Sequence, residues 1–94
     1  MELVIDGSRI ASEEDLHDVI SKGLALPNWY GRNLDALWDV LTGMVERPLK
    51  VIWLNSKQSK MTLPRYEQIL SLFREVELQD QQCNWIDRFT LEIR

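Results

Sequence analysis

The sequence predicts an α/β protein in which a small three-stranded parallel sheet is packed with three to four helices. Its 94 residues are enough for one hydrophobic core and too few for two. Short β-favouring segments alternate with longer segments of helical periodicity, in the order strand, helix, helix, strand, helix, strand. Strands separated by helices pair in parallel through right-handed crossovers. We therefore expect a single domain that comprises residues 1–94.

Turn and capping residues mark the first strand and the first helix. Residues 2–6 form a short segment that ends at Gly7, which predicts a strand. Ser12 is suited to cap a helix because its hydroxyl can accept a backbone N–H, and Asp15 occupies the capping-box position. The buried stripe of this helix contains Leu16, Val19 and Ile20. We expect Gly23 to end the helix in a left-handed conformation.

A loop with two aromatic residues, residues 24–32, leads into the second helix. Asn33 can cap a helix that runs from Leu34 to about Thr42, and Gly43 is expected to stop it in the left-handed conformation. The buried stripe of this helix is expected to contain Leu34, Leu37, Trp38 and Leu41.

The second half of the chain supplies two strands and a long helix. Residues 49–54 are apolar and short, which predicts a central, mostly buried strand with Trp53 in the core. Residues 55–60 are polar and have room for one short helical turn, and a longer helix is expected to open at residues 62–64 with proline in its first turn. Its inner face contains Tyr66, Ile69, Leu70, Phe73 and Val76. Residues 88–93 alternate polar and apolar side chains and predict the last strand.

Composition and charge argue against a membrane protein or a nucleic-acid-binding protein. The formal net charge of −4 is unsuited to a phosphate backbone and suits a basic partner instead. No apolar run approaches the roughly 18 residues of a membrane span, and the N-terminus lacks the pattern of a signal peptide, so we expect a cytoplasmic protein. Cys83 is the single cysteine and is expected to be a buried spectator thiol.

Sequence motifs of enzymes are absent, and we expect neither catalysis nor a bound cofactor or metal. The chain has no glycine-rich phosphate loop, no HExxH motif and no Gly-x-Ser-x-Gly elbow. His17 is the only histidine, and its acidic neighbours Asp15 and Asp18 indicate a solvent-facing side chain. Asp35 and Asp39 together are too few oxygen ligands for a hard cation.

The most unusual feature of the chain is a pair of carboxylates on the second predicted helix. Asp35 and Asp39 lie one turn apart on one flank, beside Trp38. Like charges at this spacing repel by roughly 0.2–0.5 kcal/mol, and Asp39 lies in the half of the helix where the dipole prefers a cation. We therefore expect a positively charged partner to neutralise the pair.

The aromatic residues before this helix have two possible roles. Trp29 and Tyr30, next to Gly31, either anchor the loop on the core or form a protein-binding hot spot. Trp38 is expected to pack mainly on the core and to leave one edge free for a partner.

Taken together, these segments resemble the barstar family of intracellular ribonuclease inhibitors. The longest matching stretch is Asn33-Leu34-Asp35-Ala36-Leu37-Trp38-Asp39. Further matches are Ile5, Gly7, Ile10, Asp15-Leu16-His17, residues 24–27, Tyr30-Gly31, residues 41–43, Val45-Glu46, Pro48, residues 58–60 and residues 73–75. The resemblance implies a three-stranded parallel sheet with helices around it. It also implies a protein that occupies the active-site cleft of a small basic ribonuclease of the barnase type in a 1:1 complex.

The resemblance also assigns roles to particular residues. Asp39 resembles the carboxylate that takes the place of the RNA phosphate among the cations of the nuclease, and Asp35 is its neighbour. Gly31, Asn33, Thr42 and Gly43 would support the contact, and Glu75 would be a flanking acid from the later helix. The full set expected to bind the partner is Trp29, Gly31, Asn33, Leu34, Asp35, Trp38, Asp39, Thr42, Gly43, Met44, Glu46 and Glu75.

Two positions of this chain depart from the family pattern. Trp29 replaces a tyrosine, and Met44 replaces an aromatic residue, both at positions that a partner would contact. Such changes can shift the preferred nuclease while the inhibitory mode is retained.

Two other functions compete with inhibition. One is an acidic interaction or regulatory module of the same fold whose partner is not a nuclease. The other is a hydrolase that uses Asp35 and Asp39, although the sequence supplies no nucleophile or metal set to accompany them.

Overall fold

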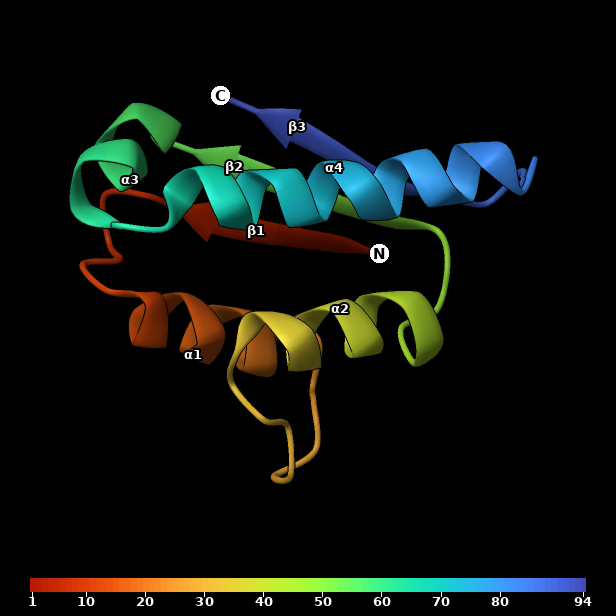
Figure 1. Ribbon diagram of the computed structural model, residues 1–94, viewed down its shortest axis with the longest axis horizontal. Coiled ribbons are helices and arrows are strands. Elements are labelled where there is room, and N and C mark those ends of the chain that lie inside the picture. The colour runs from red at the N-terminus through yellow and green to blue at the C-terminus, as the bar shows by residue number, and fades with distance from the viewer.

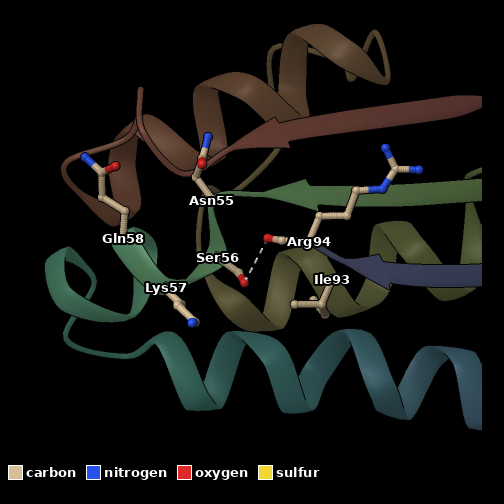
Figure 2. Close-up of a pocket in the computed structure, with 6 residues that line it drawn as sticks. All are labelled: Asn55, Ser56, Lys57, Gln58, Ile93 and Arg94. Atoms are coloured by element: carbon tan, nitrogen blue, oxygen red, sulfur yellow. Dashed lines mark hydrogen bonds between the residues drawn. The ribbon is translucent and has the colours of Figure 1, made fainter.

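The computed structural model describes residues 1–94 and contains three strands and four helices (Figure 1). In chain order the elements are β1 (Glu2–Asp6), α1 (Glu13–Gly23), α2 (Leu34–Gly43), β2 (Leu49–Leu54), α3 (Ser56–Thr62), α4 (Tyr66–Gln82) and β3 (Phe89–Ile93). The predicted α/β fold class and the predicted strands are confirmed, and the short helical turn expected at residues 55–60 is the helix α3.

The strands form one parallel sheet in the order β1–β2–β3. In the central strand, Val51 lies opposite Leu3 of β1 and Leu91 of β3, and all three side chains are buried. The alternating residues Val4 and Thr90 are exposed, so the helices cover one face of the sheet. Right-handed crossovers that step in one direction across a sheet return on the same side, which explains this one-sided cover. Figure 1 shows α1 and α2 in one row beside β1, and α4 alongside the strands.

The core is organised around the indole of Trp53, which is fully buried as predicted. Its ring centroid lies 5.3 Å from that of Tyr66 and 5.8 Å from that of Phe73, both in edge-on contact. The indole Nε1 donates a 2.9 Å hydrogen bond to the Oγ of Ser59 in α3. A buried indole N–H needs such a partner, and this bond attaches the short helix α3 to the central strand.

The two N-terminal caps predicted for the first half of the chain are present. Asp15 donates its backbone N–H to the Oγ of Ser12 at 3.1 Å, and Ala36 donates to the Oδ1 of Asn33 at 2.8 Å. The carboxylate of Asp15 accepts the N–H of Ala11, one residue earlier than a standard capping box would require. The sequence therefore located the starts of α1 and α2 correctly.

The predicted left-handed helix ends at Gly23 and Gly43 are wrong. Both glycines are the last residues of their helices, but no glycine has a positive φ, and Ala25 takes the left-handed conformation after α1 with φ of 51°. A Cβ atom at residue 23 would lie 2.2 Å from Cδ1 of Leu3. The absence of a side chain at Gly23 therefore allows α1 to approach β1 closely.

The ends of α4 also differ from the prediction. The helix begins at Tyr66, so Pro64 precedes the helix instead of occupying its first turn. Cys83 caps the other end and is exposed, so the predicted buried thiol is wrong. Asp80 is the last buried residue of the helix, and the chain beyond it leaves the core. No helix of the structure is both long enough and apolar enough to span a bilayer.

A buried ion pair joins α2, α4 and β3. The Nε of Arg47 donates to the Oδ2 of Asp80 at 2.7 Å, and the side chains are 11% and 1% exposed. Asp80 also accepts the backbone N–H of Phe89 at 2.6 Å, at the start of β3. The guanidinium in addition donates to the backbone carbonyls of Leu41 at 2.7 Å and Val45 at 2.9 Å. The carbonyl of Leu41 in the last turn of α2 is therefore held by a cation, which the helix dipole favours.

We expect Asp80→Ala to destabilise the protein strongly. Removal of the carboxylate leaves the buried guanidinium of Arg47 and the N–H of Phe89 without their acceptor, and breaking a buried pair in this way costs about 3–5 kcal/mol. Urea unfolding measures the loss. Glu75→Ala removes an exposed carboxylate from the same helix and should change stability by less than about 0.5 kcal/mol. Similar losses in the two variants would contradict the role assigned to Asp80.

Candidate partner-binding surface

The loop of residues 24–33, called the aromatic loop below, is attached to α1 by a buried hydrogen bond. Tyr30 is 5% exposed, and its hydroxyl lies 2.7 Å from Nδ1 of His17, which is 1% exposed. The prediction of a solvent-facing His17 is therefore wrong. The side chain lies three residues before the buried Ile20 and so shares the inner face of the helix. The spacing of three residues between His17 and Ile20 is a sequence signal for a buried His17. The acidic neighbours Asp15 and Asp18 indicated the opposite.

The environment of His17 favours its neutral form. Burial lowers the pKa of the imidazole, and the nearby carboxylate of Glu13 only partly opposes this effect. Nε2 is buried without a hydrogen-bond partner and lies 3.9 Å from a carboxylate oxygen of Glu13. We assign the proton to Nε2, where it faces a negative charge, so that Nδ1 accepts the hydroxyl of Tyr30. Burial also raises the pKa of Tyr30 to about 12, which keeps that hydroxyl protonated.

The other end of the aromatic loop is attached to α2. The side-chain amide of Asn33 donates to the carbonyl of Gly31 at 3.3 Å while its oxygen caps the helix. Trp29, directly before the anchored Tyr30, is 71% exposed. The structure thus assigns different roles to the two aromatic residues: Tyr30 is the anchor, and Trp29 presents its indole to solvent.

Asp35 and Asp39 are exposed on α2 and form no hydrogen bond or ion pair in the structure. Eight of the eleven Lys and Arg side chains pair with acidic residues elsewhere in the chain, so few cations remain to neutralise Asp35 and Asp39. The helix contains no basic residue that could neutralise the two carboxylates. Glu46 and Glu75 are likewise exposed and unpaired. The predicted surface therefore contains carboxylates that the protein itself leaves without a cation.

A hollow of about 320 Å³ lies between the aromatic loop and α2, next to one of these carboxylates. Its lining consists of Trp29, Tyr30, Gly31, Ala36, Asp39, Val40 and Met44. Met44 is 48% exposed, so the lining that includes Asp39 also offers exposed apolar surface from Met44 and Trp29. The structure thus brings together four of the twelve residues predicted to bind a partner. Trp29 and Gly31 precede the helix cap at Asn33, and Asp39 and Met44 follow it.

The remaining predicted residues surround this hollow less directly. Leu34 and Trp38 are half-buried and pack against the core, which leaves part of each exposed as expected for Trp38. Thr42 donates its hydroxyl to the carbonyl of Trp38 at 2.7 Å, whereas Gly43 borders open space. Glu75 lies on α4, the helix that contacts α2.

Comparison with known proteins identifies the family of this chain. The model of the family described as "Barstar (barnase inhibitor)" matches residues 1–87. The chain belongs to the barstar family. A protein of Bacillus subtilis (strain 168) named "Putative ribonuclease inhibitor YrdF" is 42% identical over 82 residues, which cover 84% of this chain and 90% of that protein. The predicted resemblance to barstar is therefore confirmed.

One ion pair at the border of this barstar-family surface was not predicted. Nη2 of Arg32, in the aromatic loop, lies 2.5 Å from Oδ1 of Asp18 in α1. The two residues are fourteen positions apart in the sequence, and no local pattern connects them.

No group of three or more His, Cys, Asp or Glu side chains is arranged to hold a metal ion.

We expect the stability of the protein to fall as the pH decreases from 7 towards 5. The unfolded chain takes up a proton at His17 near the ordinary pKa of 6.5, whereas the folded protein takes it up only at lower pH because its pKa is lowered. The stabilisation from neutral His17 is complete above pH 6.5 and is lost as the pH falls through the folded pKa, by at most about 1.4 kcal/mol per pH unit.

Two measurements check this expectation. Urea unfolding at stepped pH gives the loss of stability, and an NMR titration of the single imidazole gives its folded pKa directly. Most carboxyl groups titrate below about pH 5, so this range isolates His17. An imidazole midpoint at or above 6.5 would contradict the structural assignment.

Proposed function

We propose that this chain is a stoichiometric inhibitor of a small basic ribonuclease of the barnase type, which it blocks by covering the active site in a 1:1 complex. The observation that carries the proposal is the exposed, unpaired pair of Asp35 and Asp39, of which Asp39 lines a mostly apolar hollow. Membership of the barstar family and similarity to a protein named as a ribonuclease inhibitor support it. The inhibitor acts in the cytoplasm as an immunity protein that protects the cell from the nuclease.

Electrostatic complementarity explains how such a surface blocks a ribonuclease. A ribonuclease holds the phosphodiester of its substrate with cationic side chains, so an inhibitor must present anions in the place of that phosphate. Asp39 borders the hollow, and the apolar surfaces of Trp29 and Met44 exclude water around it in the complex. Exclusion of water lowers the local dielectric constant and strengthens the attraction between the carboxylate and the nuclease cations.

The attachments of the aromatic loop reduce the entropy that binding costs. The loop is held to α1 through Tyr30 and to α2 through Asn33 before any partner arrives. A preformed surface loses less conformational freedom on association, which increases affinity. Trp29 and Met44 are the most exposed apolar residues of the hollow, and they determine which nuclease the surface fits.

Co-expression with candidate ribonucleases in a host that they poison tests the proposed function. We expect the chain to rescue growth with at least one small basic ribonuclease, and activity titrations with the purified proteins to end at a molar ratio of one. An acidic interaction module without inhibitory function would give neither rescue nor loss of nuclease activity.

We expect Asp39→Ala to abolish tight binding without destabilising the free protein. The substitution removes like-charge repulsion and an unfavourable dipole interaction, so the free energy of unfolding should stay the same or rise slightly. Loss of one partner from a desolvated charge network costs about 2–5 kcal/mol or more of binding energy, a range that includes measurements on barstar complexes. Thermal melts and inhibition titrations give the two quantities separately.

The variants Asp35→Ala and Asp35→Ala/Asp39→Ala complete the test. Because the two carboxylates face the same cationic cleft, their effects on binding should be non-additive, whereas their effects on stability should remain small. If both single variants unfold and the folded fraction binds as well as the wild-type protein, the two aspartates are structural.

A further inference from the structure

The aromatic loop and α2 contain one positive charge that works against the proposed function. Arg32 is the only Lys or Arg between residues 24 and 46, and it lies three residues before Asp35. Its backbone is left-handed, with φ of 54°. Its guanidinium is directed to α1, where Nη2 lies 2.5 Å from Oδ1 of Asp18 and 3.2 Å from the carbonyl oxygen of Glu14. A cation beside an acidic surface is thus paired with an acid on another element.

The aromatic loop has two attachments besides this ion pair. The loop is already held through the buried Tyr30, two residues before Arg32, and through the helix cap at Asn33 directly after it. The side chains of Arg32 and Asp18 are 38% and 51% exposed, and ion pairs with this exposure add little to stability. The remaining consequence of the pair is electrostatic, because Asp18 cancels the charge of Arg32 and fixes its position.

We propose that Asp18 is a positioning residue for partner binding, which keeps the guanidinium of Arg32 on α1 and away from Asp35 and Asp39. This inference rests on the proposed function, because it concerns a basic partner. With Asp18 in place, the two carboxylates on α2 stay unpaired and available to the nuclease cations. Without it, the guanidinium of Arg32 is no longer held on α1, and its positive charge is free to approach the acidic surface and to oppose a positively charged protein.

Four variants of the full-length chain test the proposal against a ribonuclease that the wild-type protein inhibits. They are Asp18→Asn, Arg32→Gln, the double variant, and Glu14→Gln as the matched control. Glu14 is exposed on α1, and its side chain is unpaired, so its substitution removes the same negative charge and leaves the ion pair intact. Thermal melts verify folding, and dissociation constants are measured at low and high salt.

We expect Asp18→Asn to bind about two- to fivefold more weakly than Glu14→Gln, the range of one exposed ion pair. Arg32→Gln should bind at least as well as the wild-type protein, and the double variant should recover the affinity that Asp18→Asn loses. The difference between Asp18→Asn and Glu14→Gln should shrink as salt rises, because exposed charges are screened over about 10 Å at 0.1 M.

Other outcomes overturn the proposal in distinguishable ways. If Arg32→Gln binds as weakly as Asp18→Asn and the double variant shows no recovery, the ion pair anchors the loop and does not shield the acidic surface. If Asp18→Asn and Glu14→Gln bind equally well, Asp18 contributes only to the overall charge. If the wild-type chain inhibits no ribonuclease at all, the proposed function itself fails, and the inference fails with it.

Discussion

The buried ion pair between Asp80 and Arg47 is the interaction on which the placement of α2 depends. The Asp80 carboxylate joins β3 through the N–H of Phe89 and, through Arg47, holds the carbonyl of Leu41 in the last turn of α2. The helix has no basic residue in its own last turn, so the guanidinium of Arg47 supplies the cation that its dipole requires. One ion pair thereby fixes the helix that presents Asp35 and Asp39.

The same helix shows how the protein separates stability from its candidate function. Inside the molecule, charges are paired with short, well-directed contacts, as for Arg47 and Asp80. On the outer flank of α2, two carboxylates stay unpaired, whereas most of the Lys and Arg side chains of the chain pair with acidic residues elsewhere. The imidazole of His17 shows a related compromise, because its buried Nε2 has no hydrogen-bond partner while Nδ1 anchors Tyr30 and the aromatic loop. Such costs are expected where side chains are arranged to present a surface.

Local patterns in the sequence were sufficient for most of the fold. The strands, including the buried central strand that contains Trp53, and the caps at Ser12 and Asn33 follow from periodicity and hydrogen-bonding capacity within a few residues. The interpretations of Gly23 and Cys83 failed for one reason. Whether the last residue of a helix contacts another element or solvent depends on where the helix ends relative to the sheet. The side chain of Leu3 that faces Gly23 is twenty residues away in the sequence, and Cys83 lies where α4 has left the core.

For the candidate site, the sequence by itself determined the chemistry and the tertiary structure decided its arrangement. The spacing of Asp35 and Asp39 on one flank follows from the helix alone, because 3.6 residues per turn place positions four apart side by side. The division of roles between Tyr30 and Trp29, the hollow beside Asp39 and the pairing of Arg32 with Asp18 all depend on how the aromatic loop packs on α1 and α2. Contacts between residues distant in the sequence leave no periodic signal, since each is made only when separate elements have packed together.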